Sequence, residues 1–273
     1  MLNISNTIEP KQFSELGAAI VFDCRFSLAD PGEGEALYRE GHIPGAHYLH
    51  LERDMSSPVM RHGGRHPLPD PADFVALLAS YGVGPGTDVI AYDDHRLAYA
   101  TRLWWLMKSL GFKPPVILNG GYQAWLGAGG DPCCELPAAV ADLHRGRSTD
   151  AFSYSGHCDI EDLRAAQDLG CILIDSREER RYLGLEEPID PIAGHIPGAL
   201  NHPWQGVTDT EGRFLAEEQQ REHWGEVLDA QRLVVYCGSG VTACVNLFSL
   251  ASMGRDDAEL YAGSWSDWCS YLW

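Results

Sequence analysis

The hexapeptide GHIPGA occurs twice in this chain, at 41–46 and at 194–199. An apolar run that ends in Asp-x-Arg precedes each copy, at 18–25 and at 171–177. An apolar run with a tyrosine near its end follows each copy, at 89–94 and at 233–238. Corresponding features keep the same order and lie 143 to 153 residues apart. A match of this extent indicates the tandem duplication of one domain of about 120–140 residues, which is close to the commonest domain size.

The duplication predicts two domains of similar size. We expect a first domain over residues 1–141, a linker over 142–156 and a second domain over 157–273. The join is polar, contains glycine and has no hydrophobic period, which is typical of a connection between domains.

Within each half, short β-branched runs alternate with segments of helical period, such as PADFVALLASYG (71–82) and DIEDLRAAQDLG (159–170). This alternation predicts an α/β fold with two tandem domains, each a mostly parallel sheet flanked by helices. Each domain is expected to close with a Gly-aromatic-Trp turn, at 120–125 and at 263–268. Ligands of such sheets bind beyond the carboxyl ends of the strands, which is where Cys237 is expected to lie.

The charge balance restricts the partners of this chain. Its 20 Lys and Arg residues face 39 Asp and Glu residues, which gives a formal net charge of −19. Such a surface repels the phosphates of nucleic acids and of anionic membranes, so neither is expected as a partner. A small anionic substrate would be repelled as well, and a site for one must gather positive charge locally.

Neither a membrane span nor a targeting signal is expected. No apolar stretch approaches the ~18–20 residues of a membrane helix. The first residues, MLNISNTIEPKQF, lack the basic and apolar regions of a secretory signal, so the expected location is the cytoplasm. The eight cysteines are scattered and form no Cys-x-x-Cys pair, which favours free thiols over zinc ligands.

The run LVVYCGSGVTAC (233–244) places Cys237 directly after a predicted strand. Gly238 and Gly240 permit a narrow loop whose backbone N–H groups point inward, and a helix that begins near Thr242 adds its positive end. Such a site favours an anionic sulfur and predicts a nucleophile. A buried structural thiol at the end of a strand is the alternative interpretation.

Comparison with other cysteine sites and with the first half narrows the role of Cys237. A Cys-x5-Arg phosphatase loop requires an arginine where this chain has Ala243. A protease-like Cys–His pair has no histidine near in sequence, although His42 or His195 could approach in space. The residue in register with Cys237 in the first half is Asp93, so the first domain is predicted to be catalytically inactive.

The two GHIPGA motifs, the CGSGVT loop, Asp93 in the matching position and the terminal LYAGSWSDW together resemble a tandem-domain rhodanese-type sulfurtransferase of the thiosulfate and 3-mercaptopyruvate sulfurtransferase family. The resemblance covers essentially the whole chain. It implies that Cys237 takes sulfane sulfur from a small anionic donor as a persulfide and passes it to a thiol or to cyanide. It also implies that the sulfur is held by a loop of Gly238, Ser239, Gly240, Val241 and Thr242. No metal and no organic cofactor is implied.

Two donors are compatible with this resemblance, thiosulfate and 3-mercaptopyruvate. The Gly-Ser-Gly sequence after Cys237 resembles that of mercaptopyruvate-preferring enzymes, and the Ser239 hydroxyl could relay a proton to an enolate-like leaving group. In DSREERRYLG, Arg181 matches the position that binds the anionic end of the donor, with Arg180 as the alternative. Mercaptopyruvate enzymes usually carry a second arginine farther on, whereas residues 185–199 contain three acids and no Arg or Lys. The Gly-Ser-Gly loop therefore favours 3-mercaptopyruvate as the donor, whereas the missing second arginine weighs against it.

Other basic residues are expected to be structural. Arg177 recurs as Arg25 in the first half and is expected to form an ion pair at the end of a strand. His42 and His195 also recur, so they are expected to support the fold. The basic segment 61–69 is either a solvated loop or part of the entrance to the site.

Two further functions are compatible with the sequence. The fold could serve as a non-catalytic binding or regulatory module, or the chain could carry sulfur to a partner protein. Rapid and selective alkylation of Cys237 near neutral pH would favour the enzyme over the binding module.

Overall fold

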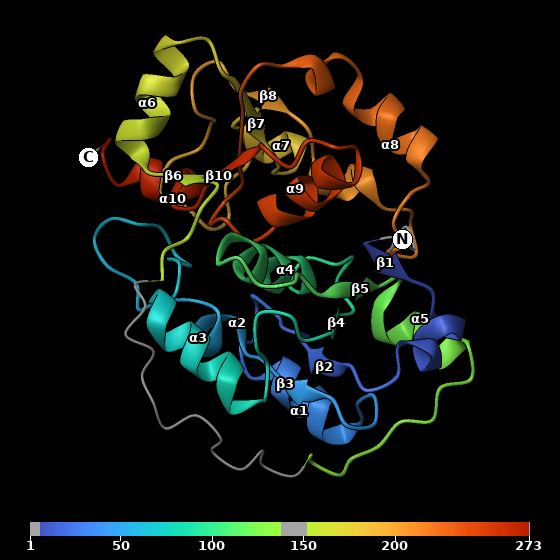
Figure 1. Cartoon of the computed structure of the whole chain (residues 1–273). Coiled ribbons are helices and arrows are strands. Elements are labelled where there is room, and N and C mark those ends of the chain that lie inside the picture. The colour runs from blue at the N-terminus through green and yellow to red at the C-terminus, as the bar shows by residue number, and fades with distance from the viewer. Residues whose placement is uncertain (1–5, 138–151, 273) are drawn as a thin grey trace. The chain divides into compact units, whose positions relative to one another are not determined.

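The computed structural model describes residues 6–137 and 152–272, except for the side chains of residues 14–16. Two compact units are present, and each is built around a five-stranded sheet (Figure 1). All pairings between the strands of these sheets are parallel, which confirms the predicted α/β fold with two tandem domains. Of the predicted linker, residues 142–151 lie outside the described residues.

The first unit is formed mainly by the amino-terminal half. Its strands are β1 (Thr7–Ile8), β2 (Ile20–Asp23), β3 (His47–Tyr48), β4 (Val89–Tyr92) and β5 (Val116–Leu118), and its helices are α1 (Glu33–Glu40), α2 (Leu51–Asp54), α3 (Pro71–Ser80), α4 (Ala100–Ser109) and α5 (Gly121–Gly127), with a 3-10 helix at Pro10–Leu16. The strand order is β1-β5-β4-β2-β3. All four residues of the central strand β4 are buried, because helices cover both faces of a parallel sheet.

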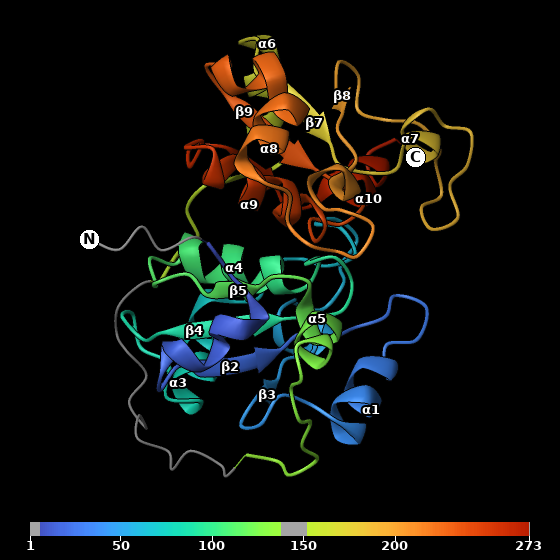
Figure 2. The ribbon, with the colours of Figure 1, turned by 90° about the vertical axis from the view of Figure 1, so that its right-hand side faces the viewer.

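The second unit repeats this arrangement. Its strands are β6 (His157–Cys158), β7 (Ile172–Asp175), β8 (Leu200–Asn201), β9 (Leu233–Tyr236) and β10 (Glu259–Tyr261), and its helices are α6 (Ile160–Asp168), α7 (Glu179–Tyr182), α8 (Glu217–Trp224), α9 (Ala243–Ser252) and α10 (Ser264–Cys269), with 3-10 helices at Trp204–Val207 and Gly225–Asp229. The strand order is β6-β10-β9-β7-β8, so β9 is central and all of its residues are buried. The loop after α7 lies beside α10, as Figure 2 shows, and Trp265 Nε1 donates to the Ile192 carbonyl there over 2.8 Å.

Two segments group with the unit of the opposite half of the chain. Residues 57–68 belong to the second unit, and residues 210–214 belong to the first. The two segments correspond in the repeat, since each contains Gly-Arg, at 64–65 and at 212–213. Segment 57–68 therefore supplies side chains that the second half does not encode.

The repeated hexapeptide is anchored on the central strand of each unit. In the second unit the backbone N–H of Ile196 donates to the hydroxyl of Tyr236 over 3.1 Å. In the first unit Ile43 donates to Tyr92 over 3.2 Å. The tyrosine near the end of each apolar run is thus the partner of the GHIPGA turn, which explains why both features recur together.

Two segments differ from the prediction. Residues 120–125 and 263–268, expected as turns, overlap the short helices α5 and α10. Aromatic residues three positions apart lie on one face of a helix, and Tyr122 and Trp125 are accordingly both buried. Burial of this aromatic face favours a helix over a turn.

The helices of both units are short. The longest helices among the described residues, α3, α4 and α9, have 10 residues each. None of the helices in the described ranges has the length and the apolar character that crossing a bilayer requires.

His202 makes the stability of the second unit depend on pH. Its ring stacks on Trp224, and burial, with a smaller contribution from the charge on His223, lowers the pKa of His202 to about 4. In the unfolded chain this histidine titrates near ~6.5. Below that pH the unfolded chain binds a proton that the folded chain does not, so stability is full above pH ~6.5 and falls as the pH drops towards 4.

We expect the free energy of unfolding to fall by about 1 kcal/mol between pH ~7.5 and pH ~5.5 through His202, measured by urea unfolding. His202→Phe keeps a ring against Trp224 and removes the titration, so it should lose less stability over the same interval. The same pH dependence in both proteins would contradict this role of His202.

Candidate functional site

Cys237 lies at the carboxyl end of the central strand of the second unit. It directly follows Tyr236 of β9, and α9 begins at Ala243. The Cys237 side chain is only 1% exposed, and the backbone N–H of Gly240 donates a hydrogen bond to its Sγ over 3.1 Å. The sulfur therefore lies inside the loop of residues 237–242, here called the cradle loop, with an amide directed at it.

Gly240 determines the shape of the cradle loop. Its φ is +77°, and a Cβ at this position would lie 2.3 Å from the carbonyl oxygen of Ala262. Both the left-handed backbone and the close approach require glycine. The same backbone conformation brings the Gly240 N–H to the sulfur.

Ser264, the first residue of α10, ties the cradle loop to the neighbouring strand. The backbone N–H of Cys237 donates to Ser264 Oγ over 3.2 Å, and this hydroxyl donates to the Tyr261 carbonyl over 2.9 Å. Ser264 has a φ of +58°, a conformation that is uncommon for residues other than glycine. The two hydrogen bonds offset this strain and hold the backbone of Cys237 in place.

The end of the cradle loop leads into α9. Val241 is buried, and its carbonyl accepts a hydrogen bond from the Cys244 N–H over 3.0 Å. Thr242 occupies the N-cap position of α9, but its side chain makes no capping hydrogen bond. The backbone of Thr242 is already helical (φ −70°, ψ −16°), whereas a capping side chain needs extended backbone, which explains why this cap does not form.

The first unit contains a corresponding loop with a carboxylate in place of the thiol. Asp93 follows β4 and is fully buried, and its carboxylate accepts four backbone hydrogen bonds of 2.8–3.1 Å. The donors are the N–H groups of His95, Leu97, Tyr99 and Ala100. Burial raises the pKa of Asp93, while these hydrogen bonds act in the opposite direction. A loop of this type thus directs several N–H groups at an anion, and Asp93 supplies that anion itself.

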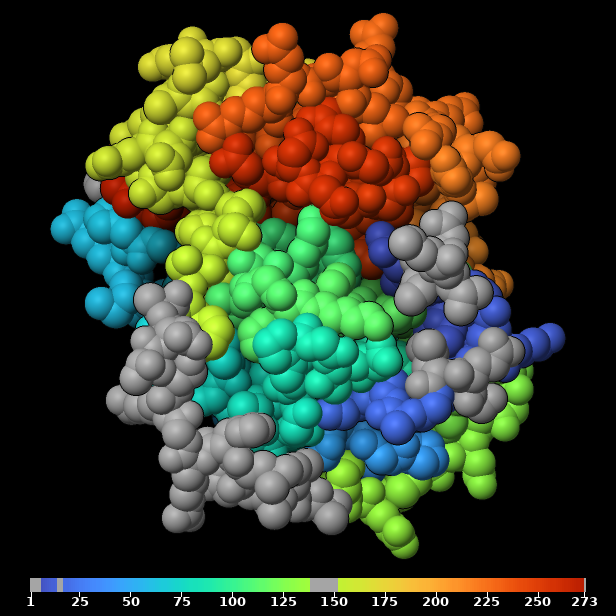
Figure 3. Space-filling view, viewed as in Figure 1, coloured from blue at the N-terminus to red at the C-terminus, as the bar shows by residue number. Residues whose placement is uncertain are grey.

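Segment 57–68 is anchored on the carboxyl-terminal end of the second unit. The backbone N–H of Gly63 donates to Asp267 Oδ1 over 2.7 Å, and His62 Nδ1 lies 2.7 Å from Ser270 Oγ. In Figure 3 this segment, in light blue, lies against the dark red carboxyl-terminal residues. The anchoring positions the next residues, Arg65 and His66, beside the cradle loop.

His66 contacts the middle of the cradle loop. Its Nδ1 lies 2.7 Å from Ser239 Oγ, and both side chains are buried. Ser239 is two residues from Cys237. A hydroxyl paired with an imidazole at this position can transfer a proton close to the sulfur.

Two guanidinium groups lie over Gly238. A Cβ on this glycine would lie 3.0 Å from Arg65 Nη2 and 3.6 Å from Arg181 Nη1. Asp190 joins the two arginines, since Arg65 Nη1 donates to its Oδ1 and Arg181 Nη2 donates to its Oδ2 over 3.2 Å. Two guanidinium groups, each paired with a buried carboxylate, thus lie beside the cradle loop of a strongly acidic protein.

The neighbouring arginines have structural partners. Arg177 forms a bidentate ion pair with Asp175 at the end of β7, with a shortest distance of 2.7 Å, as predicted, and Arg25 forms the equivalent pair in the first unit. The side chain of Arg180 is 66% exposed and pairs with a surface glutamate. Of the two candidates for the anionic end of a donor, Arg181 lies at the cradle loop and Arg180 lies on the surface.

His195 and His42 make equivalent contacts in the two units. His195 Nδ1 lies 2.8 Å from the Tyr182 carbonyl, and the two rings stack. His42 Nδ1 lies 2.7 Å from the Tyr38 carbonyl with the same stacking. Because one of these units has no thiol at its loop, the shared arrangement supports the predicted structural role of both histidines.

The eight cysteines are not joined by disulfides. Cys244 is buried in α9, and its Sγ donates to the Gly240 carbonyl over 3.4 Å. Within residues 6–137 and 152–272, no group of three or more His, Cys, Asp or Glu side chains could hold a metal ion.

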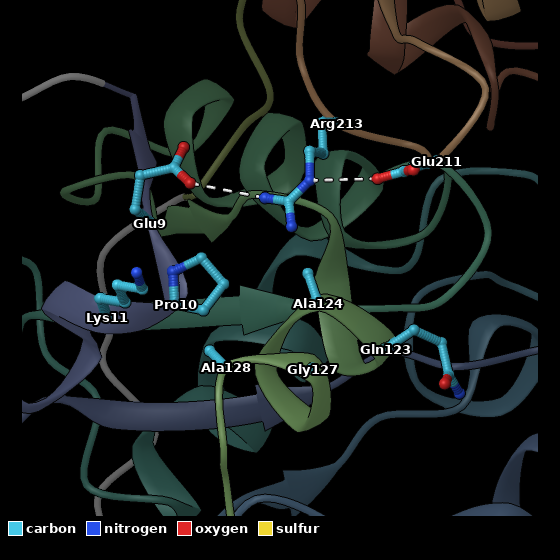
Figure 4. Close-up of a pocket in the computed structure, with 9 residues that line it drawn as sticks. All are labelled: Glu9, Pro10, Lys11, Gln123, Ala124, Gly127, Ala128, Glu211 and Arg213. Atoms are coloured by element: carbon cyan, nitrogen blue, oxygen red, sulfur yellow. Dashed lines mark ion pairs between the residues drawn. The ribbon is translucent and has the colours of Figure 1, made fainter.

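A cavity of about 760 Å³ lies in the first unit (Figure 4). Its lining residues are Glu9, Pro10, Lys11, Gln123, Ala124, Gly127, Ala128, Glu211 and Arg213. Arg213 forms ion pairs with Glu9 at 3.5 Å and with Glu211 at 3.7 Å. The lining contains no Cys, Ser or His.

Three residues at the cradle loop are absent from the sequence prediction: Arg65, His66 and Ser264. The prediction leaves segment 61–69 open between a solvated loop and the entrance to the site. One sequence signal could identify segment 61–69 as part of the site, namely the Gly-Arg pair that both halves contain, at 64–65 and at 212–213. Each pair lies in a segment that groups with the unit of the opposite half.

Residues 9–128 and 159–271 both match the family model described as "Rhodanese-like domain". A protein of Pseudomonas aeruginosa described as "Probable 3-mercaptopyruvate sulfurtransferase" is 44% identical over 256 residues, which cover 91% of this chain and 88% of that protein. The thiosulfate sulfurtransferase of Cricetulus griseus is 31% identical over 253 residues, or 89% of this chain and 82% of that protein. The solved structure of the 3-mercaptopyruvate sulfurtransferase from Leishmania major matches with a TM-score of 0.84 at 28% identity, covering 99% of this chain and 76% of that one. These similarities span both halves of the chain.

Proposed function

The chain belongs to the rhodanese-like family as a tandem-domain sulfurtransferase, and we propose that it moves sulfane sulfur through a persulfide on Cys237. The donor is a small anion, 3-mercaptopyruvate or thiosulfate, and the acceptor is a thiol or cyanide. The proposal includes an inactive first domain over 1–141, a linker over 142–156 and a catalytic second domain over 157–273.

In the first half-reaction the Cys237 thiolate attacks the transferable sulfur of the donor, and a sulfur–sulfur bond forms. With thiosulfate, the bond to the sulfonate sulfur breaks and its electron pair leaves with sulfite. With 3-mercaptopyruvate, the carbon–sulfur bond breaks, its electron pair leaves as the enolate of pyruvate, and the donor's thiol proton ends on the methyl carbon. The second donor therefore needs a proton transfer that the first does not need.

In the second half-reaction an acceptor attacks the outer sulfur of the persulfide. The acceptor bonds to this sulfur, and the sulfur–sulfur bond to Cys237 breaks, which regenerates the Cys237 thiolate. The product is thiocyanate when the acceptor is cyanide and a persulfide when the acceptor is a thiolate. With thiosulfate, the transferred sulfur already has the oxidation level of sulfane sulfur. With 3-mercaptopyruvate, the sulfur gives two electrons to the carbon that leaves as the enolate and becomes the methyl group of pyruvate. In neither case is an external oxidant or reductant needed.

The observation that carries this proposal is the hydrogen bond of 3.1 Å from the Gly240 N–H to Cys237 Sγ. The corresponding loop of the first unit directs four N–H groups at the carboxylate of Asp93. By analogy, the cradle loop stabilises the negative charge of a thiolate and of the outer sulfur of a persulfide.

The direct test is the intact mass of the reduced protein after brief exposure to each donor, followed by peptide mapping. We expect the mass to increase by one sulfur atom, with the modification on Cys237 and its loss after addition of cyanide. A protein that gains no sulfur from either donor would contradict the proposal and favour the non-catalytic binding module.

The pair of His66 and Ser239 leads to a donor-specific prediction. Replacement of His66 by glutamine keeps a hydrogen-bonding side chain but removes the proton transfer that 3-mercaptopyruvate needs. We expect kcat with 3-mercaptopyruvate to fall by ~10²-fold and kcat with thiosulfate to change by less than ~3-fold. Steady-state assays with both donors measure this, and equal losses with the two donors would show that His66 acts only through the structure of the loop.

A further inference from the structure

We propose that the cavity of about 760 Å³ in the first unit binds a short zwitterionic peptide, with the ammonium group of the peptide at Glu211 and its carboxylate at Lys11. All residues that line this cavity belong to the first unit, whose loop after β4 carries Asp93 in place of a thiol. The inference therefore goes beyond the proposed function, because no step of sulfur transfer through Cys237 uses this cavity.

Asn119 fixes one wall of the cavity. It directly follows β5 and is only 8% exposed. Its Nδ2 donates to Glu9 Oε1 over 2.6 Å, and its Oδ1 accepts from the backbone N–H of Phe214 over 2.7 Å. A buried amide thus joins the amino-terminal segment to segment 210–214. The matching position in the second half is Ala262, whose side chain has no polar atom, so this wall is specific to the first unit.

Arg213 is held at the same wall. Gly120 has a φ of +77°, and a Cβ on it would lie 3.2 Å from Arg213 Cγ and 2.7 Å from Ala124 Cβ. The stem of Arg213 therefore lies against bare backbone, which only glycine provides. Its guanidinium lies between two acids, 3.5 Å from Glu9 and 3.7 Å from Glu211 (Figure 4). Because these groups are positioned in advance, a ligand loses less free energy to their ordering when it binds.

The two ends of the cavity differ in charge. Figure 4 shows Glu211 on one side of Arg213, and Lys11 on the other side, beyond Glu9. Near Glu211 a smaller cavity of about 160 Å³ adjoins, and its lining contains three acids, Asp93, Asp94 and Glu211, and one base, Arg96. Lys11, at the opposite end, is exposed and forms no ion pair with any of the described residues. The Glu211 end thus favours an ammonium group, and the Lys11 end favours a carboxylate.

The surface between these ends is apolar. Pro10, Ala124, Gly127 and Ala128 form it, as Figure 4 shows. The volume of the cavity lies in the range of sites that bind drug-sized molecules. A single amino acid carries both charges next to one carbon atom and cannot reach both ends. A peptide of about two or three residues carries its charges at opposite ends of an uncharged backbone, which matches the cavity in size and in charge.

The test is an NMR titration of the isotope-labelled protein with trialanine, at low salt because salt screens exposed charges. Three capped peptides serve as comparisons. N-acetyl-trialanine lacks the ammonium group, trialanine amide lacks the carboxylate, and N-acetyl-trialanine amide lacks both. We expect trialanine to bind ~5-fold more tightly than either singly capped peptide, because each cap removes one partly exposed ion pair. The amide signals that shift should belong to residues 9–11, 123–128 and 211–213. Equal affinities, shifts confined to other residues or no binding would overturn the proposal.

Two variants test which charge lies at which end. Lys11→Gln should weaken the binding of trialanine and of N-acetyl-trialanine by ~5-fold and leave that of trialanine amide unchanged. Glu211→Gln should weaken the binding of trialanine and of trialanine amide by the same factor and leave that of N-acetyl-trialanine unchanged. The opposite pattern, or the same change for every peptide, would overturn the assignment of the two ends.

Lys113→Gln and Glu40→Gln are the matched controls. Both residues are exposed, belong to the first unit and lie outside the lining of the cavity. These variants remove the same charges and should leave every affinity unchanged. Equal losses in the controls would mean that the peptides respond to the net charge of the protein, and the site would be wrong. Trialanine has no thiol and accepts no sulfur, so this result is independent of whether Cys237 forms a persulfide.

Discussion

Replacement of Cys237 by serine is expected to abolish sulfur transfer from both donors, with a loss of at least ~10⁴-fold, because residues 237–242 contain no other thiol and the thiol of Cys244 is buried in α9. The hydroxyl is close in size to the thiol and can accept the Gly240 hydrogen bond, so the variant should fold. The measurement is the rate of thiocyanate formation with thiosulfate and of pyruvate formation with 3-mercaptopyruvate.

The matched control is Cys171→Ser, at a partly exposed cysteine of the same unit that precedes β7. This variant should retain full activity. Retention of turnover in Cys237→Ser, or an equal loss in the control, would mean that the chemistry does not pass through Cys237.

Gly240→Ala is expected to lower kcat by ~10²- to 10³-fold with either donor, which is the usual effect of removing one N–H donor from an anion site. A Cβ there would lie 2.3 Å from the carbonyl oxygen of Ala262, and backbone cannot move aside as a flexible side chain can. The loop must therefore shift, and the N–H that donates to Cys237 Sγ shifts with it. Steady-state kinetics with both donors measure the effect.

Gly254→Ala separates loss of the loop geometry from simple backbone strain. Gly254 also has a positive φ, +87°, but a Cβ on it would have no atom within 4 Å. This variant should lower the free energy of unfolding by ~1 kcal/mol and leave kcat unchanged. If both variants lose activity equally, the effect of Gly240→Ala comes from strain rather than from the cradle loop.

The fold and the identity of the candidate nucleophile follow from local patterns. The strands β2, β4, β7 and β9 lie in apolar runs. Each GHIPGA turn hydrogen-bonds the tyrosine at the end of the central strand, and glycines mark the loop after Cys237. The recurrence of these features at a nearly constant spacing identifies the duplication. Local patterns are less informative about the segments at 120–125 and 263–268, because burial of aromatic residues against the sheet converts a predicted turn into a helix.

The amino-acid sequence by itself determined the two α/β domains, the loop that holds Cys237 and the replacement of that cysteine by Asp93 in the first half, since each depends on residues that are neighbours in the chain. Only the tertiary structure placed Arg65 and His66 beside this loop, because segment 57–68 groups with the second unit although the first half encodes it. It also showed that Arg181 lies at the cradle loop whereas Arg180, its neighbour in sequence, is exposed and has a different ion-pair partner. Contacts between residues far apart in the chain depend on packing, and neither hydrophobic period nor motif spacing encodes them.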